Sequence, residues 1–322
     1  MKNFKPSYVW PNPAFPFRVY YESSDLRIFI IENIQHNWEW MSVYASAFRE
    51  TDYFFVYCGW YHSEGFAKEA DEIFSILKLD RNKFFFLFNS NSELENFQPY
   101  GFIGEVINQN AWLDESLVMK PMENTRKIYD AIYVGRFSAF KRHYLAQQVD
   151  NLALVAGNNH GNKVVEDIPS HIYRNEVPLS PDEVCLKINE SRCGLILSAE
   201  EGACFASSEY LLCGVPVVST LSEGGRDVWY DSYNSIVCDA HPNSVAEAVS
   251  FFVENPRDPD LIRSAYLAKA KFYRYKLIAK LAEMFHQHGQ YQVDAYEFFH
   301  ETFMHKLRRS YRPNFEEIFG AK

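Results

Sequence analysis

Two cations follow a short apolar segment in the second half of the chain. Residues 131–135 are typical of a buried strand, and Arg136 and Lys141 come after it, five positions apart. A turn that leads from a strand into a helix presents backbone N–H groups at the positive end of the helix dipole, and nearby Arg and Lys side chains add charge. The pattern predicts a diphosphate site. The alternative is an ordinary strand-to-helix loop with solvated cations.

Two carboxylates follow a later apolar segment, residues 194–198. Glu201 and Glu209 are separated by seven residues. If a helix begins near Ala203, Glu209 lies about two turns into it, up to roughly 12 Å from Glu201 along the axis. Carboxylates accept hydrogen bonds from vicinal hydroxyls, so this pair could hold the two ends of a nucleotide-sugar. Taken alone, such a pair is more often a glutamate that favours the helix N-terminus and a second one on the helix surface.

The order of these motifs resembles the donor domain of the retaining glycosyltransferases of family 4. That family has a strand that ends in Gly-Arg with a lysine five residues on, an E-G-x-G-x4-E helix, a G-x-P-V-V strand and a Gly-Gly loop. The resemblance covers roughly residues 104–255. Its matching residues are Gly135-Arg136, Lys141, Glu201-Gly202, Glu209, Gly214-Val215-Pro216-Val217-Val218 and Gly224-Gly225.

The resemblance implies a role for each of these residues. Arg136 and Lys141 would neutralise the diphosphate of a nucleotide-sugar donor. Glu209 would bind the ribose hydroxyls, and Glu201 would approach the donor sugar as a catalytic residue. The other residues that the resemblance places around the donor are Gly135, Gly202, Ala203, Cys204, Phe205, Thr220, Gly224 and Gly225. Cys204 stands where the family has its second glycine, so the backbone would approach the sugar less closely.

The resemblance also implies a mechanism without a metal. The departing diphosphate would be stabilised by Arg136, Lys141 and helix dipoles, and the leaving phosphate would take the acceptor proton, so no enzymic nucleophile is expected. The Asp-x-Asp match, Asp258-Pro259-Asp260, falls in a turn that a proline interrupts. We therefore predict no metal and no other cofactor.

Strands that alternate with helical segments must position these residues. The segments with strand character are 26–31, 53–58, 83–88, 106–107, 131–135, 152–156, 194–198, 215–219 and 235–238. This alternation predicts an α/β protein with parallel sheets, whose ligands lie at the carboxyl ends of the strands. The resemblance implies a GT-B-like arrangement of two doubly wound, Rossmann-like domains that face a cleft. We predict an acceptor-side domain over 1–120, a donor domain over 121–288, and a helical tail over 289–322 that packs on the first domain.

The N-terminal half resembles the family less, because residues 32–38 replace the usual Gly-Gly loop after the first strand. Proteins of this architecture often present a histidine from the N-terminal domain to the donor. His62 follows the strand at 53–58 and is the expected residue, and His36 after the first strand is the competitor. A hydrogen-bonded structural histidine is the alternative for each.

Charge and composition limit the partners. The net charge of −10 disfavours binding to duplex nucleic acid, which needs clustered Lys and Arg. The one dense basic run is Lys306, Arg308, Arg309 and Arg312, which we interpret as a solvated helix face, with weak contact to anionic lipid headgroups as the alternative. The sequence has no run of 18 uncharged apolar residues and no cleavage signal. These features predict a cytoplasmic protein, with a location at the inner face of a membrane as the alternative.

The function predicted from these patterns is retaining transfer of a sugar from a nucleoside-diphosphate sugar to a glycan or lipid-linked acceptor. The alternative is a nucleotide-sugar-binding partner subunit with little catalysis, suggested by the short acceptor domain and the altered glycine turn. A sugar-nucleotide epimerase or a phosphorylase ranks lower. The base, the sugar, the acceptor and the oligomeric state stay open at this stage.

Overall fold

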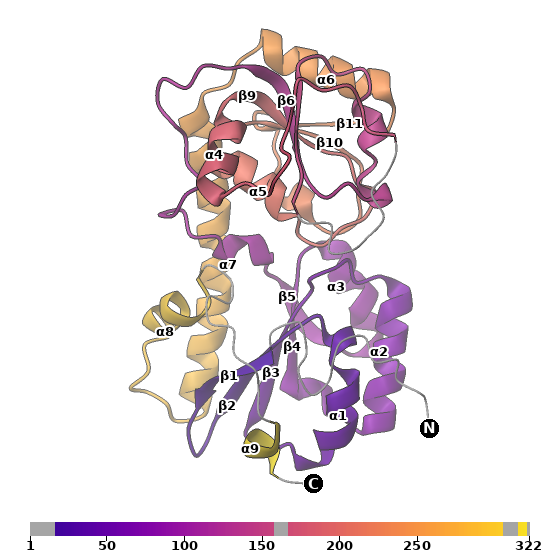
Figure 1. Cartoon of the computed structure of the whole chain (residues 1–322). Helices are drawn as coiled ribbons and strands as arrows, with labels where there is room; N and C mark the ends of the chain where they lie inside the picture. Colours follow the sequence, from indigo (N-terminus) through magenta and orange to yellow (C-terminus); the bar gives the residue numbers. More distant parts are fainter. Residues whose placement is uncertain (1–16, 158–166, 305–314, 321–322) are drawn as a thin grey trace. The chain divides into compact units, whose positions relative to one another are not determined.

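The computed structural model describes residues 17–157, 167–304 and 315–320, and it divides into two compact units. The first unit takes in the described residues up to Leu113 and those from Phe272 onward, and the second takes in those of Asp114–Lys271. Helix α7 (Pro259–Gln287) begins in the second unit and continues into the first (Figure 1). By this division the chain changes units at 113/114 and at 271/272, where the expected boundaries are 120/121 and 288/289. The second change falls inside α7, which contains no turn residue at that point.

The first unit is built on a five-stranded sheet whose spatial order is the sequence order. Its strands are β1 (Phe17–Glu22), β2 (Arg27–Glu32), β3 (Asp52–Tyr57), β4 (Phe84–Phe88) and β5 (Ile103–Val106). The pair β1 and β2 is antiparallel, and the pairs from β2 to β5 are parallel. All six residues of β2 are buried, as expected for a strand that is covered on both faces.

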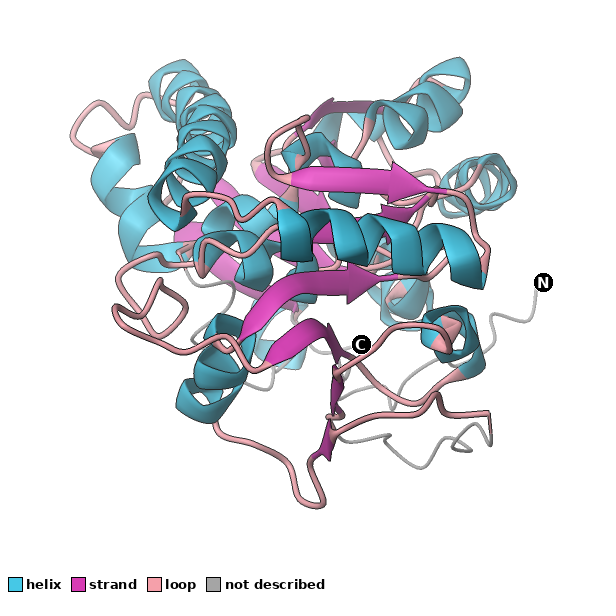
Figure 2. Cartoon of the chain, turned by 90° about the horizontal axis from the view of Figure 1, so that it is seen from above, coloured by secondary structure: helices cyan, strands magenta, loops and turns pink. Residues whose placement is uncertain are grey.

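Helices cover both faces of this sheet because its central strands carry apolar side chains on both faces, as in the Phe-rich β4. Three of these helices are α1 (Trp38–Tyr44), α2 (Glu64–Leu77) and α3 (Asn91–Phe97). They pack in one core with Phe54 and Phe86. On the other face, the ammonium group of Lys280 in α7 lies 5.2 Å from the ring centroid of Phe85. Figure 2 shows the chain from above, with helices on either side of strands.

The described part of the C-terminal tail contacts the first unit. Tyr21 of β1 packs edge-on against Phe298 of α8 (Ala295–Thr302), with ring centroids 5.9 Å apart. Phe319 of α9 (Phe315–Phe319) stacks on Trp40, with centroids 5.7 Å apart. Within the helical tail expected over 289–322, α8 ends at Thr302. The basic run Lys306, Arg308, Arg309 and Arg312 lies outside the described residues.

The second unit contains a six-stranded parallel sheet in the order β11-β10-β9-β6-β7-β8. Its strands are β6 (Tyr129–Val134), β7 (Leu152–Val155), β8 (Tyr173–Arg174), β9 (Ser191–Ile196), β10 (Val217–Thr220) and β11 (Ser235–Cys238). The chain starts in the middle at β6, builds outward to β8, and returns to place β9 on the other side of β6. The point where the direction reverses, between β6 and β9, is where open α/β sheets bind ligands.

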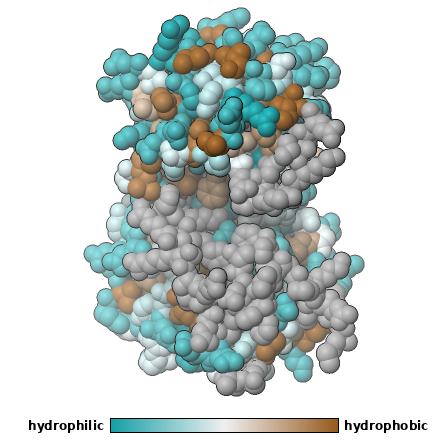
Figure 3. All heavy atoms as spheres, viewed as in Figure 1, coloured by the Kyte–Doolittle hydropathy of each residue, from teal (hydrophilic) through white to brown (hydrophobic). Residues whose placement is uncertain are grey.

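The helices of the second unit are α4 (Pro181–Asn189), α5 (Phe205–Leu212), α6 (Pro242–Glu254) and the first part of α7. Among the described residues, no helix is both long enough and apolar enough to cross a membrane. On the face seen in Figure 3, hydrophobic residues lie in separate spots among hydrophilic ones.

Candidate functional site

The carboxyl ends of β6 and β9 bring together two residues that are far apart in the sequence. Lys141 lies in the turn after β6, Glu201 lies in the loop after β9, and the Lys141 ammonium forms an ion pair with Oε1 of Glu201. Lys141 is 8% exposed and Glu201 is 6% exposed. The cation expected for the diphosphate and the carboxylate expected for the sugar are therefore partners within one buried cluster.

The second oxygen of Glu201 is also occupied. Ser198 Oγ donates a hydrogen bond of 2.9 Å to Oε2, and Nη1 of Arg226 lies 3.7 Å from the same oxygen. Burial by itself would raise the pKa of Glu201, but the charge of Lys141, a hydrogen bond from Cys204 and the charge of Arg226 bring it below its usual value. Glu201 is therefore ionised at neutral pH.

Arg226 is a residue of this cluster that the sequence analysis did not identify. Its side chain is 1% exposed, and Nε donates to Ser219 Oγ at 3.1 Å while Nη1 donates to Ser198 Oγ at 2.7 Å. Nη2 donates to the carbonyls of Ile196, Ser198 and Thr220. The guanidinium thus ties the ends of β9 and β10 together. The signal in the sequence was its position directly after Gly224-Gly225.

The Gly-Gly loop positions the loop of Glu201. The Glu201 N–H donates to the carbonyl of Glu223 at 3.1 Å. Gly224 has φ +124°, and a Cβ there would lie 1.8 Å from the Glu201 carbonyl oxygen. Gly225, with φ 97°, precedes the 3-10 helix η8 (Arg226–Trp229). Both residues were expected to border a cleft. Their backbone conformations also bring the Gly224 backbone against the Glu201 carbonyl and begin the 3-10 helix that carries Arg226.

Cys204 adopts a backbone conformation that is usual for glycine. It precedes α5 with φ 55°, in the left-handed region, which costs a residue with a side chain roughly 1–2 kcal/mol. Burial and the charge of Glu201 raise the pKa of Cys204 to about 12, so the thiol stays protonated and donates to Glu201. Gly202 and Ala203 are buried beside it, and Phe205 is half-buried.

Arg136 and Glu209 are the two expected site residues that have no oppositely charged partner among the described residues. Both are half-buried. The Arg136 guanidinium lies 5.5 Å from the ring centroid of Phe140, in the turn after Gly135. Glu209 lies in α5, and burial, with a smaller contribution from Cys185, raises its pKa to about 7.

The turn after β6 differs from the expected helix. Two 3-10 helices, η6 (Ala139–Lys141) and η7 (His143–Ala146), are separated by Arg142, whose φ of 52° interrupts any longer helix. Nη2 of Arg142 donates to Thr220 Oγ1 at 2.7 Å. Thr220 is 1% exposed, so its hydroxyl belongs to the buried framework of the strand ends. Side-chain charge, rather than an α-helix dipole, is what this turn offers an anion.

His62 lies inside the core of the first unit, where it is 1% exposed and packs against Phe66 and Phe97. Burial lowers its pKa to about 4, so the ring is neutral at pH 7. Nδ1 lies 2.8 Å from the Trp60 carbonyl. Since a carbonyl can only accept, Nδ1 carries the proton, and Nε2 is a buried acceptor without a hydrogen-bond partner among the described residues. The competitor, His36, lies in η1 (Ile34–His36) and is half-buried.

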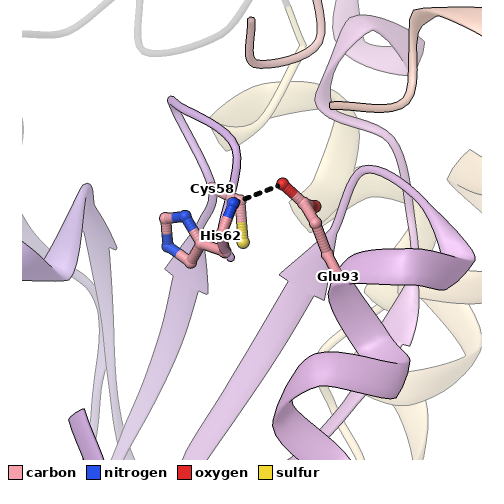
Figure 4. A group of neighbouring side chains, drawn as sticks. All are labelled: Cys58, His62 and Glu93. Carbon is pink, nitrogen blue, oxygen red and sulfur yellow. Dashed lines mark hydrogen bonds between the residues drawn. The ribbon is translucent and has the colours of Figure 1, made fainter. Parts of the chain in front are cut away.

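Cys58 and Glu93 lie beside His62, with one possible ligand atom of each residue within 4.8 Å of the others (Figure 4). Both Glu93 oxygens already accept backbone N–H groups, from His62 at 3.0 Å and Asn89 at 2.6 Å. Burial raises the pKa of Glu93 to about 8. Figure 4 shows the imidazole turned away from Glu93. We interpret this cluster as a hydrogen-bonded part of the core and assign it no ion.

No protein-family model and no curated protein sequence matches this chain. Solved structures do match it. Sucrose-phosphate synthase from Thermosynechococcus elongatus has a TM-score of 0.57 at 13% identity, over 81% of this chain and 73% of that one. Anabaena HepE, solved with UDP and glucose, has a TM-score of 0.54 at 14% identity, over 79% and 78% of the two chains. The pneumococcal O-GlcNAc transferase GtfA, solved with UDP and GlcNAc, has a TM-score of 0.51 at 13% identity, over 78% and 55%.

Likeness at these identities concerns the fold. It agrees with the α/β organisation described above, in which parallel sheets lie between helices and the second sheet is doubly wound around β6 and β9. The chain has the GT-B fold of these glycosyltransferases.

Proposed function

We propose that this chain transfers a sugar, with retention of configuration, from a nucleoside-diphosphate sugar to a glycan or lipid-linked acceptor. The observation that carries the proposal is the arrangement at the ends of β6 and β9. Arg136 and Lys141 offer charge for a diphosphate, Glu209 offers a carboxylate for ribose, and the buried Glu201 lies between the two cations Lys141 and Arg226. Similar folds solved with UDP and glucose, or with UDP and GlcNAc, support the proposal.

Leaving-group stabilisation is the main chemical contribution of these residues. As the bond from the sugar to the diphosphate breaks, negative charge grows on the phosphate oxygens, and fixed cations in a site with little water stabilise it. The leaving phosphate then accepts the proton of the attacking acceptor hydroxyl. The proposal assigns no step to His62, because its ring is 1% exposed and is enclosed by Phe66 and Phe97.

A screen of thermal stability tests the proposal. UDP, GDP, dTDP, CMP and their sugars are added in turn, and a ligand at a hundred times its dissociation constant should add about 2.7 kcal/mol to the free energy of unfolding. We expect one base to stand out, and the matching nucleotide-sugar to be hydrolysed slowly in the absence of an acceptor. If no ligand in the set stabilises the protein, the proposed function is wrong.

The second candidate is a partner subunit that binds a nucleotide-sugar with little catalysis. Cys204 favours it, because the family that the sequence resembles has a glycine at this position and this chain has a side chain there. Donor hydrolysis separates the two functions: binding without any hydrolysis or transfer would support the partner subunit.

Replacing Glu209 with glutamine should stabilise the free protein at high pH and weaken its binding of ribonucleotides. The pKa of Glu209 is about 7 in the folded protein, against an ordinary value of 4.5. When folding raises the pKa of a carboxyl, that carboxyl destabilises the folded state increasingly as the pH rises from the ordinary pKa to the raised pKa. The expected gain at pH 8 is on the order of 1–3 kcal/mol, and the two proteins should be equally stable at pH 4.

Urea unfolding at pH 4 and pH 8 measures the gain in stability, and calorimetry with the preferred ribonucleotide measures the loss of affinity. Glu247→Gln is the matched control, since Glu247 is an exposed glutamate of α6. Unchanged affinity in Glu209→Gln would show that Glu209 does not hold the ribose.

Chelation should leave turnover intact. Arg136 and Lys141 would supply the positive charge that a bound divalent cation gives to other transferases. Transfer rates are compared before and after dialysis against EDTA. Loss of activity with EDTA and its return with Mn²⁺ would overturn the proposal of a metal-independent reaction.

A further inference from the structure

Glu201 is shared by two cations that are held in different ways. Lys141 contacts Oε1 with its ammonium group, which otherwise lies 5.2 Å from the ring centroid of Phe140. Arg226 lies 3.7 Å from Oε2, and each of its three guanidinium nitrogens donates to the ends of β9 or β10. The Lys141 ammonium can therefore move without breaking sheet contacts, whereas Arg226 cannot.

We propose that Arg226 is a positioning residue of the donor site, which keeps Glu201 in place and ionised while Lys141 leaves that carboxylate to bind the diphosphate. The inference rests on the proposed function, because it concerns the same site. Ser198 bridges the two residues: its hydroxyl accepts a hydrogen bond from Arg226 at 2.7 Å and donates one to Glu201 at 2.9 Å. The orientation of Glu201 thus depends on Arg226 both through charge and through this hydroxyl.

The physical reason is the cost of burying an unpaired charge. A buried carboxylate that loses its cation takes up a proton, because burial disfavours the charged form. The groups around Glu201 come from four elements: Tyr133 of β6, Lys141 of the following turn, Cys204 at the start of α5, and Arg226 of η8. Burial raises the pKa values of Tyr133 and Cys204, so both are neutral at pH 7.

Arg142 is the remaining nearby cation. Its Nε donates to the Leu197 carbonyl at 2.6 Å and its Nη2 donates to Thr220 Oγ1. No contact between Arg142 and Glu201 is present among the described residues. When Lys141 turns to a phosphate, Arg226 is therefore the cation that stays beside Glu201.

The first experiment measures affinity for the preferred nucleoside diphosphate by calorimetry between pH 7 and pH 8.5. In Arg226→Gln, Glu201 should take up one proton when Lys141 moves to the diphosphate. The affinity should then fall by about tenfold for each unit by which the pH rises, relative to the wild-type protein. The double variant Glu201→Gln/Arg226→Gln should lose this dependence, because no carboxyl is left to titrate. Arg226→Lys keeps the charge and should behave like the wild-type protein.

A purely structural role for Arg226 would weaken binding equally at every pH. The same pH dependence in Arg226→Gln and the wild-type protein would overturn the inference. If Arg226→Gln does not fold, the same measurement is made on Arg226→Lys. A steep fall of affinity with rising pH in that variant would overturn the inference, because a positive charge at position 226 would then fail to keep Glu201 ionised.

A second experiment needs no ligand, so it separates this inference from the proposed function. Lys141→Ala imitates the departure of the ammonium group. Glu201 should remain ionised at pH 7 in this variant and become protonated in Lys141→Ala/Arg226→Gln. The readout is the infrared band of a protonated carboxyl, assigned through its loss on adding Glu201→Gln. An ionised Glu201 in the double variant would overturn the inference even if the protein binds nucleotide-sugars.

Discussion

Replacing Lys141 with alanine should weaken the binding of a nucleoside diphosphate by about a hundredfold and leave the binding of the matching nucleoside nearly unchanged. A hydrogen bond to a charged group contributes roughly 1.5–3 kcal/mol, which corresponds to about tenfold to more than a hundredfold in affinity. Lys141 should lie at the upper end of this range. Its removal also leaves the charge of Glu201, its present partner, facing the diphosphate.

Arg136→Ala should show a smaller loss of the same kind, because Arg136 has no carboxylate partner among the described residues. Calorimetry with UDP or GDP, and with uridine or guanosine, measures both variants. Adding Glu201→Gln to Lys141→Ala should recover part of the affinity for the diphosphate, since it removes the repulsion between the Glu201 carboxylate and the phosphate groups. Lys187→Ala is a matched control, because Lys187 of α4 pairs with Glu190. Equal losses for the diphosphate and the nucleoside would mean that the two cations are structural.

Replacing Gly224 with alanine should abolish most of the turnover and lower stability. The new Cβ would lie 1.8 Å from the Glu201 carbonyl oxygen and 2.7 Å from its carbonyl carbon, so the loop that carries Glu201 must move. Overpacking of backbone against backbone, added to an unfavourable φ, should cost on the order of 3 kcal/mol. Displacement of a catalytic group by about 1 Å reduces rates by about a hundredfold.

Gly289→Ala separates the clash from the conformational strain. Gly289 also has a positive φ, +69°, but no heavy atom lies within 4 Å of a Cβ placed there. This control should lose only about 1 kcal/mol and keep full turnover. Thermal unfolding and the rate of donor hydrolysis are measured for both variants. A Gly224→Ala protein with normal turnover would show that the loop contact does not position Glu201.

Local patterns were sufficient to predict most of the strands. Most strands correspond to short apolar segments that are rich in β-branched or aromatic residues and are separated by segments with helical periodicity, so each is recognisable by itself. These strands are β2, β3, β4, β6, β7 and β9 to β11. β5 was expected at 106–107 and lies at Ile103–Val106. β1 and β8 were not predicted: β1 precedes the first segment expected as a strand, and β8 has only two residues, so its assignment depends on pairing with β7 rather than on its own residues.

Motif spacing was enough to place Arg136, Lys141, Glu201 and Glu209 at the strand ends of the second unit, because it fixes these residues relative to β6, β9 and α5. Their partners depend on how distant strands pair. The Lys141–Glu201 pair joins residues 60 positions apart, and the bond from Arg226 to Ser198 joins residues 28 positions apart. Such contacts arise from the strand order, in which β6 and β10 both adjoin β9, and no local pattern encodes that order.

Burial was likewise a property of the whole fold. His62 follows β3 as the sequence indicated, yet the surrounding aromatic side chains enclose it and keep it neutral. The sequence identified Cys204 as a departure from the family pattern that it resembles, but only the structure shows that Cys204 has a left-handed backbone and a thiol hydrogen-bonded to Glu201. Residue identity sets what a side chain can do chemically, whereas charge state and partners depend on the dielectric surroundings that distant segments create together.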